Sequence, residues 1–229
     1  MIRSLTTLYG HKLAAIDGEI GHVKDFYIDD QSWAVRYLVT DTGDWLTGRK
    51  VLIAPHHLGS IDLDGRHLPV SLTRRQIEES PLIEMHKPVS RQFEEEYYRH
   101  YGLPFYWQGN GLWGMTSFPM IELPAVFPND GSDSSADAVP QADAHLRSTI
   151  AMHGYHIQAL DGEFGHISDF MIDDTSWSIP QLVVKTGSWL FGTEVLVDTA
   201  HVGRITFEES TVSVDMTREA IRNSPPVLV

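Results

Sequence analysis

Two related stretches decide the fold. Residues 15–33 read AIDGEIGHVKDFYIDDQSW, and residues 159–177 read ALDGEFGHISDFMIDDTSW, 144 positions later. The match extends without a gap from residues 10–81 to residues 154–225, with roughly 32 identities in about 72 positions, and such self-similarity indicates a repeated structural unit. The chain is therefore predicted to hold two copies of one module, joined by a segment unlike either copy.

Composition narrows the classes of function. The chain has 229 residues, a formal net charge of −14 and no cysteine. An excess of acid disfavours nucleic acid and anionic membrane surfaces as partners, because both are bound by clusters of Lys and Arg. The absence of cysteine excludes a disulfide framework and thiolate chemistry. The first residues lack the apolar core of a signal peptide, so we expect a cytoplasmic protein that is not inserted into a membrane.

The repeat unit reads as short strands. Asp17-Gly18 predicts a tight hairpin turn after a strand at Leu13–Ile16. Gly21, which recurs as Gly165, predicts a bulge or a backbone conformation that other residues avoid, because a bend there would let the return strand curve around a small barrel.

The second half of the unit adds strands and a helix. Alternating residues from Trp33 to Thr40 predict a half-buried strand, and Pro180 predicts that the same strand is broken or at an edge in copy two. Val51–Ile53 reads as a buried strand. Thr73 and Gln76 have the spacing of a capping box, which predicts a short helix ending before Pro81.

The segment between the copies differs in character. Residues 90–101 read SRQFEEEYYRHY, with Ser90 as the expected N-cap and Gly102 as the expected stop of a helix. An aromatic and glycine-rich run follows, and residues 128–148 are dominated by Asp, Ser, Ala and Pro, which predicts a flexible linker.

The pattern GHVKDFYID at residues 21–29, the strand through Trp33 and Val39, and VLIAP at residues 51–55 together resemble the PRC-barrel family. The resemblance covers both repeats and implies a small, strongly bent β-barrel for each. Copy two departs from it at Asp198-Thr199, where copy one has Ala54-Pro55. The family includes part of the photosynthetic reaction centre H subunit and of a ribosome maturation factor. It implies protein-interaction or scaffold roles without a common enzymatic activity.

We therefore predict a mainly β protein with two tandem PRC-like barrels, each followed by a short helix, and a helical aromatic connector. The predicted boundaries are residues 1–81 for barrel 1, 82–127 for the connector, 128–150 for the flexible linker and 151–229 for barrel 2.

Repeated acidic and histidine side chains raise a metal-binding alternative. The acidic set is best interpreted as turn caps on a solvated rim, because its spacing differs from that of a calcium loop. The histidines lack a repeated third ligand, which zinc sites require. We predict no catalytic residue, metal or cofactor. The residues concerned are Asp25, Asp29, Asp30, Asp169, Asp173 and Asp174, and His22, His57, His166 and His201.

The protein is predicted to be a non-enzymatic protein-interaction or scaffold module that self-associates and binds a protein partner of unknown identity. The alternatives are a metal-dependent enzyme or metal-binding protein and a ribosome-associated factor. Aromatic side chains are the candidate interaction residues, since Trp and Tyr are enriched in interface hot spots; their alternative role is internal packing. These residues are Tyr97, Tyr98, Tyr101, Trp107 and Trp113 in the connector, and Trp45 and Trp189 in the repeats.

Overall fold

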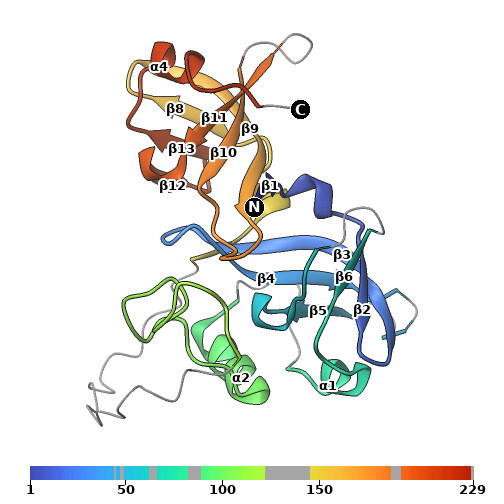
Figure 1. Ribbon diagram of the computed structural model, residues 1–229. Coiled ribbons are helices and arrows are strands. Elements are labelled where there is room, and N and C mark those ends of the chain that lie inside the picture. Colours follow the sequence, from blue (N-terminus) through green and yellow to red (C-terminus); the bar gives the residue numbers. More distant parts are fainter. Residues whose placement is uncertain are drawn as a thin grey trace.

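The computed structural model describes residues 1–43, 45–46, 49–61, 66–81, 89–121, 145–186 and 192–227. Two sheets curve into two barrel-like bodies, one above the other in Figure 1, which confirms the predicted mainly β fold. Barrel 1 has the strand order β5-β4-β3-β2-β6, and barrel 2 repeats it as β11-β10-β9-β8-β13 with the further strand β12 beside β13. The two repeats of the sequence therefore have the same topology.

The strands of barrel 1 are β2 (Lys12–Ala15), β3 (Gly18–Asp29), β4 (Ala34–Asp41), β5 (Lys50–Ile53) and β6 (His67–Pro69). The strands of barrel 2 are β8 (His156–Ala159), β9 (Gly162–Asp173), β10 (Gln181–Thr186), β11 (Thr193–Asp198), β12 (Val202–Thr206) and β13 (Thr211–Val214). Two short strands precede the repeats, β1 (Ile2–Ser4) and β7 (Leu146–Ser148). The helices are η1 (Thr6–Leu8), η2 (Pro55–His57), α1 (Arg74–Glu78), α2 (Arg91–Tyr101), α3 (Thr149–Met152), η3 (Thr199–His201) and α4 (Arg218–Arg222).

Glycine at the bend of each long strand is required by the backbone. Gly21 has φ 126° and Gly165 has φ 78°. A Cβ at Gly21 would lie 2.0 Å from the carbonyl oxygen of Asp41, and one at Gly165 would lie 2.4 Å from that of Lys185. The register between β2 and β3 also shifts beside Gly21. The predicted bulge is confirmed, and it lets each strand pass close to its neighbour.

Several local predictions can be compared residue by residue. The first hairpin turn lies one residue earlier than predicted, because Ala15 pairs with Gly18 and the Asp17 carboxylate instead accepts a hydrogen bond from the Arg74 amide. Thr73 and Gln76 form the predicted capping box of α1. Proline has no N–H to donate, and β10 accordingly begins only after Pro180.

Helix α2 and the aromatic run after it cover β4, which lies above α2 in Figure 1. Seven of the eight residues of β4 are therefore buried, on both faces. The prediction of a half-buried strand was wrong on this point, because the connector contacts both Arg36 and Tyr37, which lie on opposite faces of β4. Trp33 was also expected to begin this strand, but it has φ 52° and β4 begins at Ala34.

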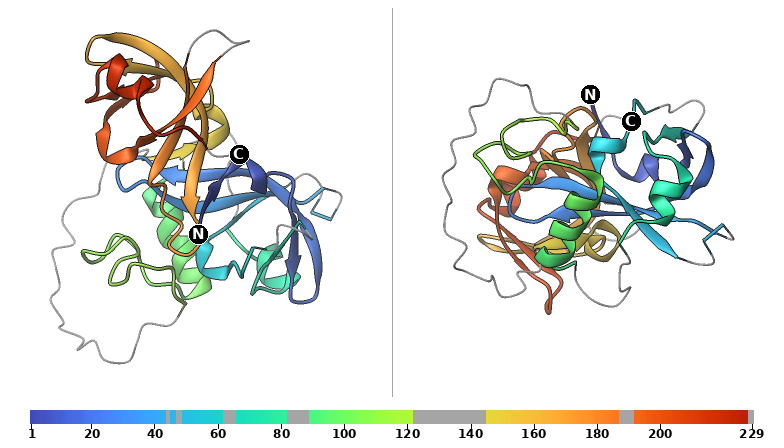
Figure 2. Two further views of the ribbon diagram at one scale, coloured as in Figure 1. Left: turned by 45° about the horizontal axis from the view of Figure 1, so that its top comes forward. Right: turned by 90° about the horizontal axis from the view of Figure 1, so that it is seen from below.

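The barrels exchange their leading strands. Strand β1 precedes repeat one but pairs with β9 of barrel 2, and β7 precedes repeat two but pairs with β3 of barrel 1. Figure 2 shows the N-terminal strand beside the second barrel. Residues 146–150, at the end of the predicted linker, belong to β7 and α3, while residues 128–144 lie outside the described residues. The exchange is reciprocal, so each barrel is completed by the other half of the chain.

The aspartates of the repeated motif hold the exchanged strands. Asp30 accepts a hydrogen bond from Arg147 at 2.8 Å, and Asp174 pairs with Arg3 in the equivalent place. Asp25 accepts one from the Ser148 hydroxyl at 2.6 Å, as Asp169 does from Ser4. Asp29 and Asp173 cap the turn that follows, as predicted. The acidic set is thus divided between turn caps and ties between the two halves.

The two repeats meet around a local twofold axis. Ala34 and Ser178, which are equivalent positions of the repeats, bridge to each other. The Val35 amide donates to the Trp177 carbonyl at 2.8 Å, and the Ile179 amide donates to the Trp33 carbonyl at 2.6 Å. The chain is therefore built like a homodimer fused into one polypeptide.

Candidate interaction site

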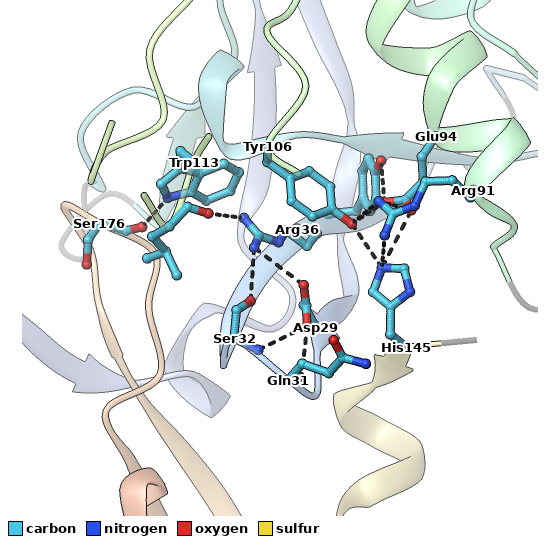
Figure 3. Close-up of polar contacts among 12 residues, drawn as sticks. Asp29, Gln31, Ser32, Arg36, Arg91, Glu94, Tyr106, Trp113, His145 and Ser176 are labelled. Atoms are coloured by element: carbon cyan, nitrogen blue, oxygen red, sulfur yellow. Dashed lines mark hydrogen bonds and ion pairs between the residues drawn. The ribbon is translucent and has the colours of Figure 1, made fainter. Parts of the chain in front are cut away.

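One outer face of barrel 1 is covered by a segment of the connector, and Figure 3 shows the contacts. Arg36, on β4, lies at their centre. Its guanidinium donates to the Leu112 carbonyl at 2.7 Å and to the Ser32 hydroxyl at 2.9 Å. Its Cζ lies 3.7 Å from the ring centroid of Tyr106 and 4.8 Å from that of Trp113. Arg36 thereby fastens the aromatic segment to the barrel by hydrogen bonds and cation–π contacts.

A carboxylate beneath Arg36 stabilises its charge. Asp29 Oδ2 lies 3.4 Å from the Arg36 guanidinium, and both side chains are buried. Burial alone would raise the pKa of Asp29, but the charge of Arg36 and the backbone amides of Ser32 and Gln31 lower it overall. Asp29 is therefore held ionised in a paired and hydrogen-bonded site.

Trp113 enters a site made by both halves of the chain. Its indole Nε1 donates to the carbonyl oxygen of Ser176 at 2.7 Å, in the turn that joins β9 to β10. Its ring meets the ring of His56 edge to face at 4.9 Å. The connector thus contacts barrel 1 through Arg36 and His56, and the second repeat through Ser176.

A second buried group links the helix of the connector to the exchanged strand region. Glu94, on α2, accepts hydrogen bonds from Tyr106 at 2.7 Å and Tyr37 at 3.2 Å, and it pairs with Arg91 at 3.1 Å. His145 lies 3.6 Å from the same carboxylate, beside β7. Burial raises the pKa of Glu94, while Arg91 acts against this rise. All these partners come from the chain itself, so the cluster acts as an internal structural network.

The structure separates the predicted interaction residues by their exposure. Tyr97, Tyr98 and Trp113 are buried, which favours internal packing for them. Tyr101, Trp107 and Trp45 are half-buried. Trp107 stacks on Phe105, and Trp45 lies under the guanidinium of Arg74. Trp189 lies outside the described residues.

The exposed apolar side chains of the connector lie just after the predicted ones. They are Met115 (54% exposed), Phe118 (49%), Met120 (40%) and Ile121 (46%). Sequence reasoning missed them because they lack a periodic pattern. The signal was present in the sequence SFPM, where a proline breaks the secondary structure and leaves large apolar residues without an element to bury them.

The histidines of the metal-binding alternative lie in unlike environments. His57 is buried against Tyr101, His22 is exposed on β3, and His201 is exposed and bound to Asp215 at 2.8 Å. Within the described part of the chain, no group of three or more His, Cys, Asp or Glu side chains is placed to hold a metal ion.

Comparison with known proteins gives one family. The family model of the PRC-barrel domain matches residues 3–77. No curated protein matches the chain. None of the helices in the described ranges has the length and apolar character needed to cross a bilayer.

Proposed function

The chain carries a PRC-barrel domain at residues 3–77, and from this we propose that the protein is a non-enzymatic interaction scaffold that self-associates and binds another protein. The buried polar groups of barrel 1 and the connector support this role. Arg36 donates to Asp29 and to the Leu112 carbonyl, and Glu94 accepts a hydrogen bond from Tyr106, so these groups serve contacts within the chain. We propose a cytoplasmic location, and a chain without cysteine fits the reducing conditions there.

The reciprocal strand exchange is the observation that carries the proposal. Each barrel accepts, on the edge of its longest strand, a short strand that lies outside its own fold. Addition of a strand to a sheet edge is a general mode of protein recognition. The same contacts are available between two chains, so the choice between closed monomer and dimer depends on the effective concentration of the two halves.

Engineered disulfides test self-association directly, since the native chain has no cysteine. Ser4 and Met171 are direct partners between β1 and β9, and the Cα atoms of antiparallel partners lie within the range a disulfide spans. We expect the double variant Ser4→Cys/Met171→Cys, refolded and oxidised, to give linked monomers when dilute and linked dimers in rising proportion as concentration increases. A dimer fraction no higher than that of Ser4→Cys alone at every concentration would contradict self-association.

The proposed binding surface for another protein is formed by the exposed apolar side chains of Met115 and Phe118. They lie on a segment that Arg36 and Trp113 hold against barrel 1. We expect Met115→Ser/Phe118→Ser to abolish capture of a specific protein partner from the lysate of the source cells. Ile16→Ser is the matched control, because Ile16 is 70% exposed in the turn between β2 and β3, and this variant should capture the partner as the native chain does. Equal capture by both variants would place the surface elsewhere.

A further inference from the structure

Barrel 2 has a hollow at the position where barrel 1 holds the connector. The hollow has a volume of about 370 Å³, within the range of ligand pockets. It is lined by Ser32 and Trp33 from the first repeat and by Ile179, Pro180, Asp198, Thr199, Ala200 and Val202, among others, from the second. Each barrel thus has a site to which the turn of the other repeat contributes.

The repeat alignment relates this hollow to the Trp113 site. Trp113 contacts Arg36 and His56 of the first repeat and Ser176 of the second. In the alignment of the two repeats, the positions equivalent to Arg36, His56 and Ser176 are Pro180, Ala200 and Ser32. All three of these residues line the hollow. The hollow on barrel 2 is therefore equivalent, by the local twofold axis, to the site on barrel 1 that Trp113 fills.

The differences between the two sites indicate what would fill the open one. The bulky Arg36 and His56 are replaced by Pro180 and Ala200, which leaves more room and removes a positive charge. Asp198 occupies the position of Ala54 in barrel 1 and adds a negative charge to the hollow. Its carboxylate accepts a hydrogen bond from the Ala200 amide at 2.8 Å. Proline and apolar side chains suit an aromatic ring, and the acid suits a cation.

We propose that the hollow on barrel 2 binds a tryptophan of a partner protein, carried on a segment with basic residues next to it. The indole lies against Pro180 and Ala200, as Trp113 lies against Arg36 and His56. The neighbouring basic side chain pairs with Asp198. This proposal rests on the proposed interaction function and names the chemistry of one partner.

A peptide provides the probe. It has the connector sequence of residues 109–116, GNGLWGMT, preceded by two lysines, and it is titrated into the isotope-labelled full-length protein. We expect the amide resonances of Ile179, Thr199 and Ala200 to shift in proportion to occupancy. A peptide with Trp replaced by Ala should shift none of them. Shifts confined to barrel 1, as from displacement of the native connector, or equal shifts with both peptides, would overturn the proposal.

Two matched substitutions test the position. Ala200→Arg fills the hollow and opposes the lysines, and it should weaken peptide binding by about tenfold or more, equivalent to about 1.4 kcal/mol. Ala220→Arg makes the same change on the exposed surface of α4 in the same barrel and should leave the affinity within about twofold. Equal affinity for both variants would refute the site. Because the disulfide test of self-association uses other residues, its success alongside a failed titration would overturn this inference alone.

Discussion

Acid should destabilise the contact between barrel 1 and the connector through two buried histidines. His56 packs against Trp113 and Tyr98, and His57 packs against Tyr101. Neither ring nitrogen of either histidine has a hydrogen-bond partner within the described part of the chain. Burial lowers the pKa of His56 from 6.5 to about 3, helped by His57 and Arg36, and lowers the pKa of His57 to about 4.

The sign and size of the effect follow from these pKa values. Both folded pKa values lie below the unfolded value of 6.5, so the unfolded chain binds protons first as pH falls. The stability of the neutral pair is complete above pH 6.5 and is lost as pH falls toward the folded pKa values. At about pH 5, each histidine should lower the free energy of unfolding by about 2 kcal/mol, at about 1.4 kcal/mol per pH unit.

Urea denaturation at about pH 7 and about pH 5 measures this loss, and His56→Phe isolates one histidine. Phenylalanine keeps an aromatic ring against Trp113 but binds no proton. Between about pH 7 and about pH 5, the free energy of unfolding should fall by about 2 kcal/mol less in the variant than in the native chain. The matched control is Tyr98→Phe, which changes the ring that His56 packs against but removes no group that titrates between about pH 5 and pH 7, so its pH dependence should follow that of the native chain. A native-like pH dependence for His56→Phe would refute the argument that burial keeps His56 neutral.

Two further substitutions test single contacts by the free energy of unfolding. Gly21→Ala places a methyl group 2.0 Å from the Asp41 carbonyl at positive φ, so it should destabilise the chain by more than about 2 kcal/mol. Tyr106→Phe removes the hydroxyl that donates to the buried Glu94 and should cost about 1.5–3 kcal/mol in urea denaturation.

Each of these has a control of the same chemistry. Gly43→Ala also acts at positive φ but meets no atom within 4 Å, so it should cost about 1 kcal/mol. Tyr101→Phe removes the hydroxyl of a half-buried ring that donates to the Gln76 carbonyl at 3.4 Å and also contacts the Ser80 side chain, with no charged partner, so it should cost less than about 1 kcal/mol. If either control costs as much as its test variant, the named contact does not explain the effect.

Local structure was largely predictable because single residues dictate it. Gly21 marks a bend that only glycine tolerates, Pro180 removes a donor from a strand, and Thr73 with Gln76 closes a capping box. The proline and the capping box act within a few residues of their cause, and Gly21 shows a positive φ of its own although the carbonyl it approaches, that of Asp41, lies on the next strand. The burial of β4 on both faces was not predictable in this way, because alternation describes one face at a time and the covering segment comes from elsewhere in the chain.

The strand exchange and the interaction surface depend on long-range contacts that the sequence shows only weakly. Strands β1 and β7 have three residues each, too few for a periodic pattern. A faint signal existed, since Arg3-Ser4 recurs as Arg147-Ser148 before the repeat we aligned. From the sequence, the repeated aspartates could either cap turns or bind these Arg and Ser residues. Only the pairing of distant segments in the structure shows which role each aspartate has.

The exchanged strands also constrain how the protein is made. Asp30 and Arg147, which tie β7 to barrel 1, are separated by 117 residues along the chain. A ribosome adding about 5–20 residues per second needs roughly 6–23 seconds to synthesise the intervening residues. Barrel 1 therefore leaves the ribosome with an unfilled edge on its longest strand and cannot close during its own synthesis. Until the second half arrives, that edge can accept a strand from a neighbouring copy, which is the contact that the proposed self-association uses.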